Sequence, residues 1–242
     1  MTALITGSSR GIGEQIATLF AQNGYSVAIN YNKSKEQAES LVKKLEAQGY
    51  NAKAFCADVS DYCAVNDMIS QVESTMGRVD VLVNNAGIAQ QKLFCDITDK
   101  DFDRMFDVNV KGVFNCTKAV LPSMIREKQG SIINISSMWG QVGASCEVHY
   151  SASKAAIIGM TQALAKEVGP SGIRVNCICP GVIETEMNAN LDEETIEQLK
   201  YDTPLMTIGT PDDVAQLALF LCSDKAKFIT GQVVGVNGGM VI

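Results

Sequence analysis

Short apolar segments alternate with helical patterns along the whole chain, and this alternation constrains the fold more than any other feature. Several segments are apolar without interruption, as in strands that helices cover on both faces. We expect strands near Thr2–Thr6, Ser26–Tyr31, Ala52–Ala57, Val79–Asn84, Ser131–Ser136, Ile173–Ile178 and Val233–Val236. We expect helices at Gly11–Gln22, Lys35–Gln48, Asp61–Met76, Asp99–Lys128, His149–Val168 and Pro211–Leu221. This order predicts an α/β fold with one doubly wound parallel sheet of about seven strands and helices on both faces.

A single domain over residues 1–242 accounts for a chain that shows no repeat, low-complexity tract or linker. Its hydrophobic content of 46% with only 5 prolines argues against disorder. One insertion, residues 182–210, interrupts the alternation, and its part 191–201 is charged and helix-prone. Because ligands bind at the carboxyl ends of strands in such sheets, we expect this insertion to form a flap over the substrate.

A glycine-rich turn, Gly7-Ser8-Ser9-Arg10-Gly11-Ile12-Gly13, joins the first predicted strand to the first helix. Glycines let a tight turn approach a pyrophosphate closely, and a helix N-terminus supplies N–H donors and the positive end of a dipole. The turn therefore predicts a dinucleotide site. Its spacing, Gly-x-x-x-Gly-x-Gly, is less common than Gly-x-Gly-x-x-Gly, and a turn that binds no nucleotide is the alternative.

Tyr150 and Lys154 lie four residues apart and share one face of a predicted helix. A free phenol has a pKa near ~10 and donates protons slowly at neutral pH. A cation beside the phenol favours the phenolate and lowers the phenol pKa toward the working pH. The pair is therefore a candidate acid/base, although the same spacing also occurs by chance on solvated helices.

The two motifs and their surroundings resemble the short-chain dehydrogenase/reductase family over essentially the whole chain. Further landmarks of the family follow in order: Asn85-Ala86-Gly87 after a strand, Asn109 on a long helix, Ser137 at a strand end, and Pro180-Gly181 followed by Thr185. The resemblance implies a Rossmann fold. Within the family, the overall resemblance is to bacterial 3-oxoacyl-acyl-carrier-protein reductases.

The second strand and the glycine turn indicate which nicotinamide cofactor the chain binds. An acid at the end of that strand would accept hydrogen bonds from a free ribose 2′-OH, but Asn30, Asn32 and Lys33 occupy this place. The Arg10 guanidinium in the glycine turn can neutralise a 2′-phosphate, which favours NADPH. The alternative is that Arg10 and Lys33 are only solvated charges. The resemblance implies that the cofactor site comprises Gly7, Ser9, Arg10, Gly11, Ile12, Gly13, Asn30, Asn32, Lys33, Asp58, Val59, Asn85, Ala86, Gly87, Tyr150, Lys154, Pro180, Gly181, Ile183 and Thr185.

The resemblance also implies a role for each catalytic residue. Tyr150 would donate a proton to a substrate carbonyl as a hydride reaches the carbonyl carbon. Lys154 would lower the Tyr150 pKa and bind the nicotinamide ribose. Ser137 would hold the carbonyl oxygen, and Asn109 would hold a water linked to Lys154. Thr185 would bind the nicotinamide carboxamide, and no metal is expected.

The substrate is less constrained. A 3-oxoacyl group on acyl carrier protein is expected first, and Arg126 and Lys128 provide basic residues for an acidic carrier. Ser171 stands where these reductases usually have an arginine, and the net charge is −7. The segment from Ser137 to Tyr150, with Trp139 and Glu147, resembles a subgroup that reduces a 5-aminopentanone-modified lysine of elongation factor P. A domain that binds NADP(H) as a redox sensor without turnover is the non-enzyme alternative.

Composition excludes several other functions. A net charge of −7 argues against a nucleic-acid surface, and no apolar run approaches the ~18–20 residues of a membrane span. The chain begins directly with a predicted strand, so we expect no targeting segment and a cytoplasmic location. Its 8 cysteines are scattered beside 1 histidine, and we expect buried free thiols rather than metal ligands. That histidine, His149, either lines the substrate mouth or serves packing.

Two predicted helices carry more apolar residues than one buried face can hold. These residues are Met105, Phe106, Val113 and Phe114 on one helix and Ile158, Met160 and Leu164 on the other. An apolar stripe left over on a soluble protein commonly meets a partner across a two-fold axis. With the apolar tail 238–242, these faces predict a homotetramer, as is common in the family; packing under loops of the same subunit is the alternative.

Overall fold

Seven strands form one parallel sheet, as the sequence predicts. The computed structural model describes residues 1–186 and 192–242. The strands are β1 (Thr2–Ile5), β2 (Ser26–Tyr31), β3 (Ala52–Cys56), β4 (Val79–Asn84), β5 (Gly130–Ile135), β6 (Ile173–Pro180) and β7 (Val233–Val236). Their order across the sheet is β3-β2-β1-β4-β5-β6-β7. The chain therefore reverses direction across the sheet between β1 and β4, which is the place where α/β sheets bind ligands.

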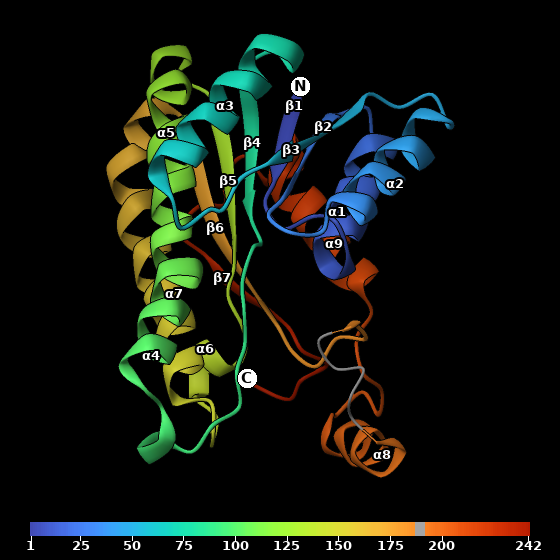
Figure 1. Ribbon diagram of the computed structural model, residues 1–242, viewed down its shortest axis with the longest axis vertical. Helices are drawn as coiled ribbons and strands as arrows, with labels where there is room; N and C mark the ends of the chain where they lie inside the picture. Colours follow the sequence, from blue (N-terminus) through green and yellow to red (C-terminus); the bar gives the residue numbers. More distant parts are fainter. Residues whose placement is uncertain (187–191) are drawn as a thin grey trace.

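Helices cover both faces of this sheet (Figure 1). The helices α1 (Gly11–Gln22), α2 (Lys35–Glu46) and α9 (Pro211–Cys222) lie on one face. The opposite face carries α3 (Tyr62–Met76), α4 (Asp99–Phe106), α5 (Gly112–Glu127) and α7 (Val148–Val168). Two further helices, α6 (Trp139–Val142) and α8 (Glu193–Asp202), lie near the carboxyl ends of the strands. The result is a three-layer single domain.

The core consists of two apolar layers, one on each side of the sheet. On β1, Ile5 belongs to the layer under α1 and α9, whereas Leu4 belongs to the layer under α3 and α5. Both side chains are fully buried. Successive residues of a strand point to opposite faces, so a strand covered on both sides must be apolar throughout. This packing explains the uninterrupted apolar segments of the sequence.

The helix predicted over Asp99–Lys128 is present to Glu127, but its centre is not α-helical. A stretch of π-helix, Asp107–Lys111, separates α4 from α5 and places Asn109 in the interior. At the start of α5, Gly112 packs against Val59: a Cβ at position 112 would lie 2.6 Å from Val59 Cγ2. A π-helical turn contains one residue more than an α-helical turn and often occurs at functional sites. The extra residue lets Asn109 face the interior while Gly112 packs against Val59.

The predicted flap is only partly described. Its ends are held together, because the Gly209 N–H donates to the Val182 carbonyl at 2.9 Å and the Glu184 N–H donates to the Gly209 carbonyl at 2.8 Å. The helical part is α8, where the Asp192 carboxylate caps the first turn by accepting from the Thr195 N–H at 2.8 Å. Residues 187–191 of the predicted flap lie outside the described residues, and covering the substrate stays a prediction.

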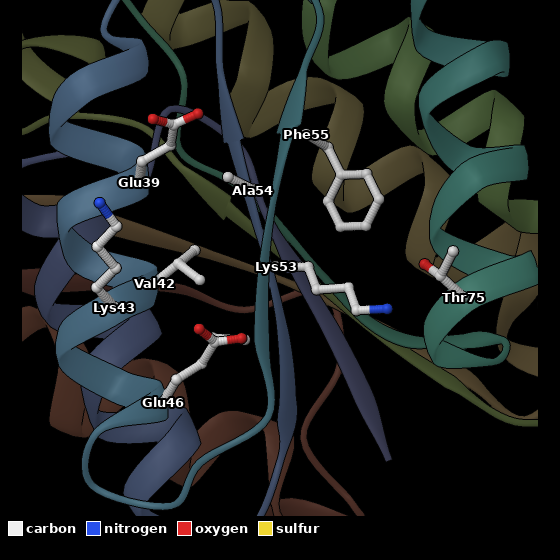
Figure 2. Close-up of a pocket in the computed structure, with 9 residues that line it drawn as sticks. Glu39, Val42, Lys43, Glu46, Lys53, Ala54, Phe55 and Thr75 are labelled. Atoms are coloured by element: carbon white, nitrogen blue, oxygen red, sulfur yellow. The ribbon is translucent and has the colours of Figure 1, made fainter.

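A shallow hollow of about 380 Å³ lies at the sheet edge on β3, between α2 and α3 (Figure 2). On β3, Lys53 and Phe55 point toward α3, and side chains of α2 such as Glu39 form the opposite wall. None of the predicted site residues lines this hollow. A lysine on an edge strand discourages pairing with another chain, so we interpret the hollow as part of a protected sheet edge.

No helix within residues 1–186 and 192–242 is both long enough and apolar enough to cross a membrane.

Candidate active site

The predicted cofactor residues all line one cleft of about 730 Å³ at the carboxyl ends of the strands. These residues are Gly7, Ser9, Arg10, Gly11, Ile12, Gly13, Asn30, Asn32, Lys33, Asp58, Val59, Asn85, Ala86, Gly87, Tyr150, Lys154, Pro180, Gly181, Ile183 and Thr185. The cleft also includes Ser137, whereas Asn109 lies just behind its wall. Residues from both halves of the sequence therefore meet at the place where the strand order reverses.

The glycine turn forms a tight cradle at one end of the cleft. Gly7 and Gly11 adopt φ values of 60° and 59°, which favour glycine. A Cβ at Gly13 would lie 2.6 Å from both Asn85 Nδ2 and the Gly7 carbonyl oxygen, so no other residue fits there without a shift. Among the described residues, no side chain caps the N-terminus of α1. The cradle therefore offers free backbone N–H groups to an anion.

Asn30 supports this cradle from beneath. Its Oδ1 accepts from the Gly7 N–H at 3.1 Å, and its Nδ2 donates to the Ala57 carbonyl at 3.1 Å. The side chain is buried, at 2% exposure. Although Asn30 borders the cleft, its amide groups are engaged by the backbone, and the structure places it as a support for the turn rather than as a free polar group.

A polar cluster around Asp58 forms the next part of the cleft. Asp58 Oδ2 accepts from Asn32 Nδ2 at 2.9 Å, and Oδ1 accepts from the Ser60 hydroxyl at 2.6 Å and the Ser60 N–H at 2.9 Å. Arg104 lies 3.4 Å from the same carboxylate. Partial burial raises the Asp58 pKa, but the Ser60 hydrogen bonds and Arg104 outweigh it and lower the pKa overall. Asp58 is therefore a fixed carboxylate at neutral pH.

At the other end of the cleft, Tyr150 and Ser137 line the same wall. Ser137 Oγ accepts from the Trp139 N–H at 3.1 Å, and the Ser137 side chain is close enough to Tyr150 to act on its pKa. Burial raises the pKa of Tyr150 to about 12, the hydrogen bond with Ser137 lowers it, and the Glu147 charge raises it further. Tyr150 therefore carries its proton at neutral pH, and the predicted lowering of its pKa does not occur in this arrangement.

Lys154 lies beside this pair and beneath the cleft. Its Nζ donates to the Ile135 carbonyl at 2.9 Å and lies 5.8 Å from the centre of the Tyr150 ring. The side chain is almost fully buried, and burial lowers the Lys154 pKa to about 8. At pH 7 the ammonium form still predominates, so a buried positive charge lies close to the phenol.

Asn109 is fixed by four contacts in the π-helical stretch. Its Oδ1 accepts from the Ile88 N–H at 2.8 Å, and its Nδ2 donates to the Ile88 carbonyl at 2.9 Å and to Ser153 Oγ at 3.0 Å. The same nitrogen lies 3.0 Å from Met105 Sδ. A Cβ at Gly87 would lie 3.3 Å from Asn109 Oδ1 and 3.4 Å from Lys154 Nζ. Asn109 and Lys154 therefore converge on the same point of the cleft wall.

The segment between Ser137 and Tyr150 forms α6 and the turn that follows it. Gly140 packs against α7, because a Cβ there would lie 2.8 Å from the Lys154 carbonyl carbon. Burial raises the pKa of the half-buried Glu147, and a hydrogen bond with Gln91 lowers it. The sole histidine, His149, is buried and bonded to Gln90 Oε1 at 3.0 Å. His149 therefore serves packing.

The strand β6 and the segment after it close the remaining side. The Gly181 N–H donates to the Val236 carbonyl at 2.8 Å, and Asn237 packs so closely that a Cβ at Gly181 would lie 2.7 Å from its Cα. Thr185 lies against the glycine turn, 3.7 Å from the place of a Gly11 Cβ. Several residues of the cleft were not predicted, including Tyr31, Ser34, Ser136, Arg104 and Glu186. Four of them are chain neighbours of predicted residues and could have been found in that way, whereas only the contact of Arg104 with Asp58 and Ser60 brings Arg104 to the cleft.

The cysteines are all free thiols, and only part of the prediction about them is right. Cys116, Cys177 and Cys179 are buried, whereas Cys56 and Cys63 are exposed, as is Cys95. The described residues contain no group of three or more histidine, cysteine or acidic side chains placed to hold a metal ion.

Comparison with known proteins gives consistent matches over nearly the whole chain. A family profile described as Enoyl-(Acyl carrier protein) reductase matches residues 7–241. The 3-oxoacyl-[acyl-carrier-protein] reductase FabG of Staphylococcus aureus is 46% identical over 239 residues, which cover 99% of this chain and 97% of that protein. The protein of the same name from Thermotoga maritima is 44% identical over 239 residues, with the same coverage of 99% and 97%. The crystal structure of a 3-oxoacyl-[acyl-carrier protein] reductase from Brucella melitensis is similar with a TM-score of 0.93 at 36% identity, covering 98% of this chain and 90% of that one.

Proposed function

The chain belongs to the short-chain dehydrogenase/reductase family of oxidoreductases acting on carbonyl and hydroxyl groups, and we propose that it reduces the ketone of a 3-oxoacyl thioester on acyl carrier protein with NADPH. One observation carries the proposal. The hydroxyls of Tyr150 and Ser137, with the buried Lys154 ammonium, lie at one end of a cleft whose other end is a glycine cradle with free N–H groups. Two adjacent hydroxyls suit a carbonyl oxygen that gains negative charge.

The residues of the cleft fit a nicotinamide dinucleotide. The glycine cradle and the uncapped end of α1 suit a pyrophosphate, and the volume of about 730 Å³ lies in the usual range for ligand sites. Asp58, fixed by Ser60 and Asn32, lies where an adenine amino group could donate to it. Arg10 and Lys33 line the part of the cleft next to β2, where the 2′ position would lie, which favours the phosphorylated cofactor.

The cofactor, when bound, supplies the hydride; the chain supplies the proton and the electrostatic field. Tyr150 holds its proton at neutral pH, so its hydroxyl can donate that proton to the carbonyl oxygen. Ser137 donates a second hydrogen bond to the same oxygen and stabilises its developing charge. The Lys154 ammonium stabilises the phenolate left after proton transfer. Asn109 keeps Ile88, and with it the wall of the cleft, in place against Lys154.

The carrier protein is supported by the names of the relatives and by two cations. Arg126 and Lys128 are exposed at the end of α5, and Arg126 lies 3.6 Å from Glu127. Acidic carrier proteins bind to such exposed cations. Ser171 supplies no third cation at this end of the molecule. Docking through Arg126 and Lys128 alone would be weak and strongly dependent on salt.

A small cationic amino-ketone is the second candidate substrate, and Glu147 favours it. Glu147 lies three residues before Tyr150 in the chain, and its charge raises the Tyr150 pKa. A half-buried carboxylate at this place would attract an ammonium group near the reacting carbonyl. It would repel an anionic substrate. A ketone on a modified lysine of elongation factor P has the chemistry that this carboxylate would recognise.

The test compares kcat/KM for NADPH oxidation with three substrates: an acetoacetyl thioester of acyl carrier protein, a small amino-ketone, and a trans-2-enoyl thioester. We expect the acetoacetyl thioester to give the highest value. A higher value for the amino-ketone, lost by about ten-fold or more in Glu147→Gln, would establish the second candidate instead. Absence of NADPH oxidation with every substrate would contradict ketone reduction and leave cofactor sensing as the alternative.

We also propose a homotetramer in the cytoplasm. The free thiols support a reducing compartment. Phe114 on α5 is 49% exposed, and Ile242 at the C-terminus is fully exposed, which supports partner surfaces at both places. Met105 and Val113 are buried inside the subunit, so they are removed from the interface that the sequence predicted.

A further inference from the structure

Arg10 has an acidic partner from a distant segment of the chain. Its guanidinium lies 3.3 Å from the carboxylate of Glu186, and both side chains are exposed, at 58% and 71%. Arg10 precedes α1 in the glycine turn, whereas Glu186 follows β6 at the root of the flap. The ion pair therefore joins two sides of the cofactor cleft, and both residues line that cleft.

The neighbouring contacts show that this approach is part of the fold. Thr185, next to Glu186, lies 3.7 Å from the place of a Gly11 Cβ. Two residues earlier in the chain, Ile183 pairs with Gly209 in an isolated parallel bridge. The backbone that leads to Glu186 is thus anchored at Ile183 and at Thr185, which keeps the carboxylate within reach of Arg10.

Two other charged groups of the cleft, Asp58 and Lys154, have partners of their own. Asp58 is held by Asn32, Ser60 and Arg104, and Lys154 donates to a backbone carbonyl. Lys33 has no ion pair among those that the structure gives for residues 1–186 and 192–242. Glu186 is therefore the acid positioned to neutralise the cation on which the proposed preference for NADPH depends.

A carboxylate and a phosphate compete for the same guanidinium N–H groups, because each presents two oxygen atoms that can accept from the N–H fork. A 2′-phosphate bound to Arg10 must displace the Glu186 carboxylate or tolerate its negative charge nearby. In either case Glu186 weakens binding of a phosphorylated cofactor. A cofactor with a free 2′-OH gains nothing from Arg10 and is affected little.

We propose that Glu186 is a specificity-determining residue that occupies Arg10 as an internal anion and thereby limits the affinity of the cleft for the 2′-phosphate. This inference rests on the proposed use of NADPH. Removing the carboxylate releases Arg10 and increases the preference for NADPH over NADH. The effect is modest because the pair is exposed to solvent.

The experiment measures dissociation constants by calorimetry for NADPH and NADH, and for the fragments adenosine 2′,5′-bisphosphate and adenosine 5′-monophosphate. Glu186→Gln is expected to tighten NADPH and the bisphosphate about 2- to 5-fold, the size of an exposed ion pair. The dissociation constants of NADH and adenosine 5′-monophosphate should change by less than about 2-fold. Glu184→Gln is the matched control, since it removes an equally exposed acid from the same segment without breaking an ion pair.

The double variant Arg10→Ala with Glu186→Gln separates the two proposals. If Glu186 acts through Arg10, Glu186→Gln has no effect on NADPH affinity once Arg10 is absent. Weaker NADPH binding in Arg10→Ala with unchanged binding in Glu186→Gln would overturn the role of Glu186 and leave the proposed function intact. Equal tightening by Glu184→Gln would also overturn it, as a general charge effect. No loss of NADPH affinity in Arg10→Ala would overturn both.

Discussion

Replacing Asn109 by alanine should damage stability and catalysis together, by amounts that follow from its contacts. The side chain is 1% exposed and makes hydrogen bonds of 2.8 and 2.9 Å to the backbone of Ile88 and of 3.0 Å to Ser153 Oγ. A typical intramolecular hydrogen bond contributes a net ~0.5–1.5 kcal/mol. Ile88 is only partly buried, so water replaces some of the loss. We expect the free energy of unfolding to fall by about 2–3 kcal/mol, and Tm by about 4–12 °C for a domain of this size.

Catalysis should fall because Ile88 follows Gly87, where Asn109 and Lys154 converge. A displacement of about 1 Å near a reacting centre can lower the rate by about 10²-fold. Urea unfolding and kcat are measured on the same samples, below the temperature at which the variant melts. Asn115→Ala is the matched control. Asn115 is an equally buried asparagine on α5 that makes one hydrogen bond, of 2.9 Å to the Val59 carbonyl.

The control should lose about 0.5–1.5 kcal/mol of stability and keep its kcat. The reasoning is refuted if Asn109→Ala unfolds at the same urea concentration as the wild type. It is also refuted if the two variants lose the same fraction of activity, because Asn109 would then act only through general stability.

Tyr150→Phe should keep NADPH affinity and lower kcat by about 10²–10⁴-fold, because only the proton donor is removed; more than about a tenth of kcat remaining would exclude Tyr150 as the acid. Ketone reduction should be nearly constant at acidic and neutral pH and decline as pH rises through about 8, where Lys154 loses its proton, since burial lowers the Lys154 pKa to about 8. A kcat profile that declines only near the free lysine value of ~10.4 would contradict that assignment. Light scattering at micromolar concentration should give the mass of a tetramer, and Phe114→Glu should shift it to smaller species; a wild-type monomer would refute the interface.

The sequence predicts the sheet well because its inner strands are buried on both faces and therefore carry an apolar signal of their own. The glycine turn is equally clear: Gly7, Gly11 and Gly13 are required by backbone geometry and close packing, which leave little choice of residue. Tyr150 and Lys154 share a helix, so their spacing alone brings them together.

The remaining features depend on contacts that no local pattern contains. Asn30 has the position of a ribose-binding residue, but its amide bonds Gly7 and Ala57 inside the fold. The Arg10–Glu186 pair joins two segments that are far apart in the sequence. The Tyr150 pKa was expected to fall because of Lys154, yet burial of the phenol raises it.

The π-helical stretch Asp107–Lys111 has a consequence for engineering this protein. A π-helical turn contains one residue more than a regular helix needs, so deletion of a single residue would restore a continuous helix from α4 into α5. Such a deletion would rotate α4 against α5 and remove Asn109 from Ile88. Design methods that reward regular helices would favour this repair, and the product would be a better-formed helix without a working site. Stabilisation is therefore better directed at the exposed faces of α2 and α3, where helix propensity can be raised far from the cleft.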